Sequence, residues 1–293
     1  MESLNTVLSR LEALGVKSEE LQKALERPTL DAASTKPFWD DPYIATQMMR
    51  FHLDPNVEAA SKRHAVIDAE CTFLAKALNL KPGKTLIDLG CGPGLYLERW
   101  LATRAQLVGV DLSSVAVVTA KKRLNAPITW IVADYRQLPK TLKADAMTLI
   151  YYDFTALPVK DQVPLLKEIT DHLNPGGLIA LDVMTPQNTY KESIRIAQRE
   201  SGFWSPKPHT EIHQVFIHTS PKVIIDQYTL IDPSGHWDTI RIQNRLLTQA
   251  ELEGMLKEAG LMPVTWLSDL SGNPYHPSSK TLAVIAQKNH SQP

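Results

Sequence analysis

Three closely spaced glycines form the pattern in this chain that most directly indicates chemistry. They lie in the segment Asp88-Leu-Gly90-Cys-Gly92-Pro-Gly94, between a short apolar run and a stretch with helical character. Glycine lets a backbone turn sharply and approach a ligand without a Cβ atom in the way. A helix that follows such a turn presents free N–H groups and the positive end of its dipole. The segment predicts a site for a nucleotide-like ligand, although strand-to-helix turns also use glycine for structural reasons alone.

Two carboxylates follow the glycine turn, each at the end of a predicted strand. Asp111 closes the run Val108-Gly-Val-Asp111, at about the 20-residue distance at which an acidic residue meets ribose hydroxyls in doubly wound folds. Asp134 ends the third predicted strand, where its carboxylate could accept a hydrogen bond from an adenine amino group. Because the carboxyl ends of parallel strands meet at one edge of a sheet, these residues converge on one crevice.

The glycine turn, the two acids and a further turn, Asn174-Pro-Gly-Gly177, together resemble the pattern of class I S-adenosylmethionine-dependent methyltransferases. The resemblance covers roughly residues 65–185 and 246–288. It implies that S-adenosyl-L-methionine is the cofactor, with Asp111 at its ribose and Asp134 at its adenine. It also implies a seven-stranded sheet whose last strand is antiparallel.

The expected cofactor site extends beyond the motif residues. Arg63 is a candidate clamp for the methionine carboxylate, although an arginine near a helix start is usually just solvated. The residues expected to bind the cofactor are Asp88, Gly90, Gly92, Gly94, Asp111, Leu112, Asp134, Tyr135, Tyr151 and Arg63.

A nicotinamide dinucleotide is the rival cofactor, and the spacing of the glycines disfavours it. The dinucleotide fingerprint runs G-x-G-x-x-G, whereas Leu97 stands where its third glycine would fall. A carboxylate at Asp88 would repel a pyrophosphate, but it tolerates a cationic sulfonium well. The sequence therefore favours S-adenosylmethionine.

The region expected to act on the methyl acceptor follows the fourth predicted strand, at Tyr151-Tyr-Asp-Phe154. Methyl transfer needs an in-line nucleophile that is held close and desolvated, and a base if the acceptor is protonated. Asp153 is the candidate catalytic residue, since it could orient or deprotonate an amine or hydroxyl; capping the following turn is the alternative. The segment lacks the Asn/Asp-Pro-Pro-Tyr-like motif common in methyltransferases of nucleobase or amide nitrogens.

Residues outside the core pattern are expected to bind the acceptor. Side-chain alternation puts Arg241 and Arg245 on one face of a predicted strand, where they could pair with an acceptor carboxylate or simply be solvated. Histidines 209, 213 and 218 lack partners at ligand spacing, so no metal site is expected; one of them, or His52, could act as a base. The expected acceptor-binding residues are Trp39, Tyr43, Tyr152, Arg241 and Arg245.

The order of the predicted elements indicates what positions these residues. Strands and helices alternate with short connections over 65–185, and the alternation resumes over 246–293, which predicts a Rossmann-like parallel sheet with helices on both faces. Three β-rich stretches, 212–218, 223–231 and 237–246, predict an antiparallel insertion within 186–245. Residues 1–64 are expected to form a helical lid with an aromatic segment that either packs on the core or covers a ligand.

Composition narrows the class of protein. The 293 residues carry a formal net charge of −1, so a nucleic acid partner is disfavoured. Two cysteines are too few for a disulfide scaffold, and no apolar run is long enough for a membrane span. We expect a cytoplasmic enzyme that methylates an N or O atom of a small molecule, with a homodimer as one option. The alternatives are a cofactor-binding scaffold or sensor without activity, and a methyltransferase of protein or RNA.

Overall fold

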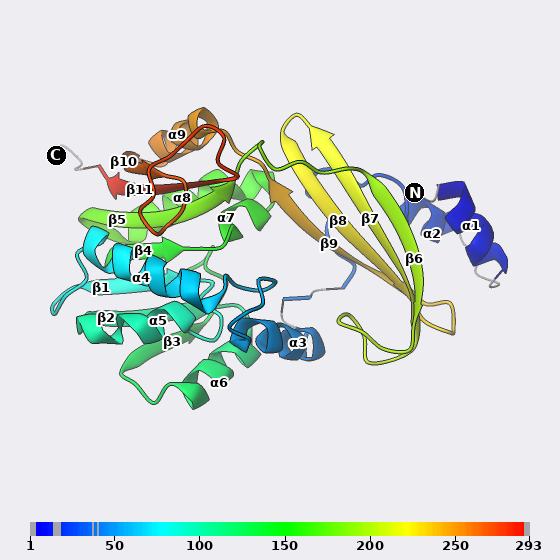
Figure 1. Ribbon diagram of the computed structural model, residues 1–293, viewed down its shortest axis with the longest axis horizontal. Coiled ribbons are helices and arrows are strands. Elements are labelled where there is room, and N and C mark those ends of the chain that lie inside the picture. Colours follow the sequence, from blue (N-terminus) through cyan, green and yellow to red (C-terminus); the bar gives the residue numbers. More distant parts are fainter. Residues whose placement is uncertain (1–3, 14–18, 37, 40, 290–293) are drawn as a thin grey trace.

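The computed structural model describes residues 4–13, 19–36, 38–39 and 41–289, and its chain forms two lobes (Figure 1). One lobe is a Rossmann-like core around a seven-stranded sheet, and the other is built on a separate four-stranded sheet. The predicted core, its helices on both faces and its antiparallel last strand are confirmed.

The core sheet has the strand order β10-β11-β5-β4-β1-β2-β3. Strand β11 is antiparallel to both of its neighbours, while the remaining pairs are parallel. The order reverses at β1, which lies between β2 and β4, so a crevice for ligands is expected at its carboxyl end. The strands are β1 (Thr85–Leu89), β2 (Gln106–Asp111), β3 (Ile128–Val132), β4 (Ala144–Leu149), β5 (Leu173–Met184), β10 (Leu261–Leu267) and β11 (Thr281–Lys288).

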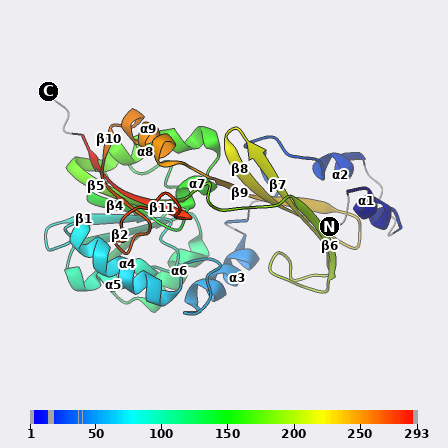
Figure 2. The same cartoon turned by 45° about the horizontal axis from the view of Figure 1, so that its top comes forward.

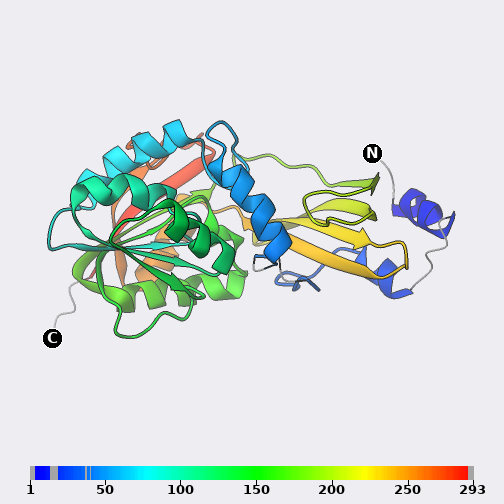
Figure 3. The same ribbon diagram turned by 90° about the horizontal axis from the view of Figure 1, so that it is seen from below.

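Helices cover both faces of the core sheet (Figures 2 and 3). Adjacent residues of β1 point to opposite faces: Leu86 packs with α4 and α5, and Ile87 packs with α8 and α9. No helix in the described ranges is long and apolar enough to cross a bilayer. The core helices are α4 (His64–Ala77), α5 (Leu95–Trp100), the 3₁₀ turn η1 (Leu101–Thr103), α6 (Ser114–Arg123), α7 (Asp153–Ala156), α8 (Val159–His172) and α9 (Gln249–Glu258).

The second lobe is an antiparallel sheet of four strands in the order β6-β7-β8-β9. Three of them correspond to the predicted β-rich stretches, but β6 was not predicted from the sequence. Its only buried apolar residue is Ile194, and charged residues interrupt the rest of the strand. Pairing with β7 along its whole length makes it a strand. The strands are β6 (Ser193–Arg199), β7 (His209–Thr219), β8 (Lys222–Ile231) and β9 (Trp237–Arg245).

The helices of the N-terminal segment lie in two places. Helices α1 (Leu4–Ala13) and α2 (Glu19–Ala24) pack on the outer face of the second sheet, where Val7 and Leu21 contact a cluster that includes Ile212. Helix α3 (Pro42–Leu53) lies between the two lobes and contacts the core (Figure 3). Helices α1 and α2 lie on the second sheet because its outer face carries an apolar cluster that must be covered.

Candidate active site

The glycine turn adopts a backbone that requires glycine for two reasons. Gly90, Gly92 and Gly94 have φ of 67°, 53° and 77°, a region that other residues rarely enter. There is also no room for side chains. A Cβ atom at Gly94 would lie 2.5 Å from Cη2 of Trp130, and one at Gly90 would overlap the carboxyl of Asp153. The turn therefore presents bare backbone at the carboxyl end of β1.

Asp111 ties the glycine turn to the end of β2. Its Oδ2 accepts a hydrogen bond from the backbone N–H of Gly92, and its Oδ1 accepts one from Ser113, both at 2.8 Å. Burial raises the pKa of the carboxyl, while these two backbone bonds act in the opposite direction. The neighbouring Leu112 is exposed, so its apolar side chain is available to contact a ligand. Asp111 can thus accept hydroxyl hydrogen bonds at its remaining lone pairs.

Asp88 is a buried anchor below the turn. Its side chain accepts a hydrogen bond from Thr148 Oγ1 at 2.7 Å, across to β4. Burial raises its pKa to about 7 against the opposing effect of the Thr148 hydrogen bond, and the carboxylate of Asp111 adds a smaller increase. The carboxyl therefore supports the site from within the sheet.

Asp134 and Tyr135 lie at the end of β3. The carboxylate of Asp134 is paired with Arg136, whose hydrogen bond lowers the pKa of that carboxyl. Arg136 also bonds Asp161 at the start of α8. Tyr135 lies against the turn, with its Cε1 3.8 Å from the Cβ position of Gly90.

The turn after β4 has an uncommon backbone. Tyr151 and Tyr152 have φ of 69° and 67°, and consecutive left-handed residues other than glycine are strained and typical of functional sites. Their rings stack with centroids 5.5 Å apart. Asp182 Oδ1 on β5 accepts hydrogen bonds from both backbone N–H groups, at 2.7 and 3.2 Å.

Asp153 follows this turn and begins α7. Its carboxyl lies against Gly90. Burial raises its pKa well above the usual range, and the carboxylates of Asp111, Asp182 and Asp88 raise it further. Among the described residues, no basic side chain and no hydrogen bond lowers the pKa of Asp153. The structure therefore places a polar group without a protein partner beside the glycine turn.

His52, at the end of α3, lies on the other side of the turn. Its ring Cε1 is 3.4 Å from the Cβ position of Gly92. Burial lowers its pKa to about 4, and its Nδ1 is buried without a partner in the described part of the chain. A neutral imidazole thus covers the glycine turn. Helix α3 is held by its N-cap Asp41, which accepts from the N–H groups of Tyr43 and Ile44.

Several expected residues lie elsewhere. Arg63 is largely exposed and pairs with Glu58 at 3.6 Å. Trp39 is exposed, and the hydroxyl of Tyr43 donates to Gly202 O. Of the expected acceptor-binding residues, only Tyr152 lies beside Asp153.

The two arginines of β9 are already bonded. Arg241 donates to Gln227 Oε1 at 2.7 Å and to the carbonyl of Ala33. Arg245 donates to Gln162 on α8 at 3.1 Å. As alternation predicted, they share a face, but this face carries the N-terminal segment. The opposite face, with Tyr228, Ile240 and Ile242, packs towards α3.

Sequence reasoning missed the carboxylate of Asp182. It is fully buried in β5 and pairs with Lys62, which lies just before α4. The available signal was an ionisable residue in the middle of an apolar run, Leu178–Val183, because such residues are rarely buried without a specific partner.

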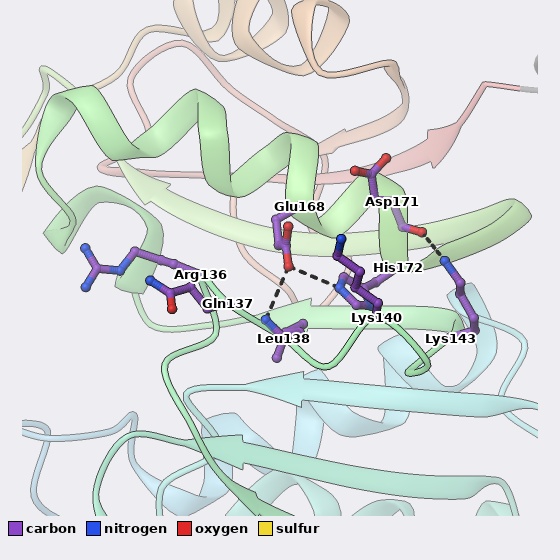
Figure 4. Close-up of a pocket in the computed structure, with 8 residues that line it drawn as sticks. All are labelled: Arg136, Gln137, Leu138, Lys140, Lys143, Glu168, Asp171 and His172. Carbon is purple, nitrogen blue, oxygen red and sulfur yellow. Dashed lines mark hydrogen bonds and ion pairs between the residues drawn. The ribbon is translucent and has the colours of Figure 1, made fainter.

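A surface hollow beside α8 is separate from this crevice (Figure 4). His172 bridges it, contacting Leu142 O and Glu168 through its two ring nitrogens. These contacts tie the loop before β4 to α8, and we assign the hollow a structural role.

Comparisons with known proteins agree with this geometry. A family model described as "Methyltransferase domain" matches residues 86–177. The chain is 33% identical over 208 residues to the cypemycin N-terminal methyltransferase of Streptomyces sp, covering 70% of this chain and 84% of that protein. It is 31% identical over 175 residues to a trans-aconitate 2-methyltransferase of Azoarcus sp. (strain BH72), covering 58% of this chain and 60% of that relative.

A solved structure shares the fold. The CcbJ methyltransferase from Streptomyces caelestis aligns with a TM-score of 0.61 at 14% identity, over 81% of this chain and 95% of that one. The fold is thus the Rossmann-like fold of that methyltransferase. The chain belongs to the class I S-adenosylmethionine-dependent methyltransferases, with S-adenosyl-L-methionine as methyl donor.

Proposed function

We propose that this methyltransferase acts on a nitrogen or oxygen atom of a small molecule held at the N-terminus of α7. The observation that carries the proposal is the carboxyl of Asp153, which lies against Gly90 and has no hydrogen-bond or ionic partner in the part of the chain that the structure describes. Asp153 is half-buried, and a carboxyl that loses part of its hydration is costly unless it is hydrogen-bonded. An acceptor N–H or O–H at this point would satisfy it.

Asp153 is the proposed catalytic residue. Its carboxylate orients the acceptor and takes the proton that the acceptor loses, and its raised pKa makes that carboxylate a stronger base. Tyr151 and Tyr152 flank this point and limit the access of water. The bound cofactor supplies an electrophilic methyl group.

The residues at the turn fit that cofactor. Positive φ at Gly90, Gly92 and Gly94 gives the turn its sharp course, and the surrounding carboxylates suit a cation. We propose that Asp111 and Leu112 contact the nucleoside, with His52 as a cover. The roles of Asp134, Tyr135, Tyr151 and Arg63 stay predictions.

The acceptor is proposed to lie between α3, α7 and the inner face of β8 and β9. Because Arg241 and Arg245 are bonded on the outer face, the site favours an amine or hydroxyl over a carboxylate. One relative is named as an N-terminal methyltransferase and another as a trans-aconitate 2-methyltransferase. A homodimer and a cytoplasmic location stay predictions; light scattering tests the first.

Radiolabelled methyl transfer into a cell extract tests the proposal. The wild-type protein is expected to label the small-molecule fraction. Asp153→Asn should lower the rate by about 100-fold or more, with little change in the affinity for S-adenosylhomocysteine. Asp161→Asn is the matched control, since that carboxylate bonds Arg136 away from the turn. Label confined to protein or RNA, or an unchanged rate in Asp153→Asn, would contradict the proposal.

A further inference from the structure

A buried cluster of ionisable side chains lies behind the Tyr151–Tyr152 turn. Lys62 Nζ donates to Glu70 Oε1 and to Asp182 Oδ2, each at 2.6 Å. Tyr96 donates its hydroxyl to Glu70 Oε2 at 2.5 Å. The Lys62 side chain is 7% exposed and both carboxylates are fully buried. The cluster joins the segment after α3 to α4, α5 and β5.

The cluster holds two carboxylates and one lysine, so Asp182 needs donors beyond Lys62. The two oxygens of Asp182 have different partners: Oδ2 accepts from Lys62, and Oδ1 accepts from the backbone N–H groups of Tyr151 and Tyr152. Lys62 Nζ also lies 6.0 Å from the ring centroid of Tyr152. The carboxylate thus connects a fixed, buried cation to the turn that precedes Asp153.

This connection matters because the turn is strained. Two consecutive tyrosines with positive φ persist only where their surroundings determine the backbone strongly. Asp182 is the side chain, among the described residues, to which both N–H groups are bonded. The position of Asp153 against Gly90 follows directly from the course of this turn.

We propose that Asp182 is a positioning residue for methyl transfer, which holds the Tyr151–Tyr152 turn so that Asp153 faces the glycine turn, while Lys62 fixes the other oxygen of Asp182. The expected effect of Asp182 on methyl transfer rests on the proposed function of Asp153. That Asp182 holds the turn does not depend on this function, so the two proposals can fail separately.

Amide hydrogen exchange of Tyr151 and Tyr152 tests the holding of the turn and needs no acceptor. In Asp182→Leu both amides lose their acceptor, and their exchange should be faster by roughly tenfold or more. Asp182→Asn keeps Oδ1 and should restore slow exchange. Glu70→Gln is the matched control, because it alters the same cluster but leaves Asp182 on the turn. If Asp182→Leu does not fold, Asp182→Ser, which cannot reach both N–H groups, replaces it with the same expectation.

Unchanged exchange in the Asp182 variant that folds, or equally fast exchange in Glu70→Gln, would overturn the proposal and leave the cluster a general structural role.

Kinetics with the acceptor found in the labelling experiment supply the second readout. Asp182→Leu should lower kcat by about tenfold or more with little change in the affinity for S-adenosylhomocysteine. Fast exchange with an unchanged kcat would confine Asp182 to the turn and remove its role in the reaction.

Discussion

Asp111 and Asp88 lie on neighbouring strands, yet their surroundings give the two carboxylates different roles. Asp111 faces the crevice, bonds the glycine turn and keeps lone pairs for a ligand. Asp88 is 3% exposed and bonds Thr148 inside the sheet. The same residue type is therefore proposed to contact the cofactor from β2, whereas from β1 it bonds the neighbouring strand β4.

Asp111→Ala should weaken the binding of S-adenosylhomocysteine by roughly tenfold or more, because it removes charge-assisted hydrogen bonds to ligand hydroxyls and loosens Gly92. Calorimetry measures the affinity. Asp145→Ala is the control, since that carboxylate bonds Thr85 N at the opposite end of the sheet. Wild-type affinity in Asp111→Ala would rule out the ribose assignment.

Asp88 should make stability depend on pH. Its pKa is about 7 in the folded protein and about 3.9 in an unfolded chain, so the folded state binds more protons between these values. Its stabilising contribution is complete below about pH 4 and is lost as the pH rises through 7. Urea unfolding should show the wild type losing up to about 4 kcal/mol relative to Asp88→Asn over this range. A difference that does not vary with pH would contradict the raised pKa.

At the scale of elements, the sequence predicted the helices and strands that a local pattern of residues determines. The alternation of strands and helices predicted the core, and a local capping box of Thr248 and Glu251 begins α9 in the structure. Strand β6 escaped prediction because its pairing with β7, and not its own pattern, defines it. The contact of Lys62 with Asp182 joins residues 120 positions apart, so no local pattern indicates it. The contact of His52 with Gly92 likewise joins residues far apart in the sequence, so no local pattern indicates it either.

The turn between β1 and α5 should tolerate no side chain at Gly90. Gly90→Ala combines a strained φ with an overlap with Asp153. Gly235→Ala is the matched control, because Gly235 has a similar positive φ of 86° but open space around it. Both variants should lose about 1 kcal/mol from backbone strain. Only Gly90→Ala should also lose S-adenosylhomocysteine binding and activity; equal losses in both variants would mean that strain alone matters.

At the scale of the molecule, the two lobes have separate apolar clusters. The core clusters lie on the two faces of the seven-stranded sheet, whereas the second sheet packs against α1 and α2 on one face and α3 on the other. Helix α3 is one of the elements that contact both, since Ile44 packs with Trp204 and His52 covers Gly92. The position of α3 thus connects the second lobe to the cofactor turn.

Damage to the outer face of the second lobe should therefore lower stability without affecting the cofactor site. Ile212 is fully buried among residues of α1, α2 and β8, and Ile212→Ala should cost about 2–5 kcal/mol. Denaturant unfolding measures the loss, and calorimetry should give an unchanged affinity for S-adenosylhomocysteine. Ile44→Ala is the comparison, because the same loss of volume lies in α3 and should weaken ligand binding through His52. If Ile212→Ala weakened binding as much as Ile44→Ala, the outer face and the cofactor turn would be coupled through the whole lobe, and α3 would not be the specific link.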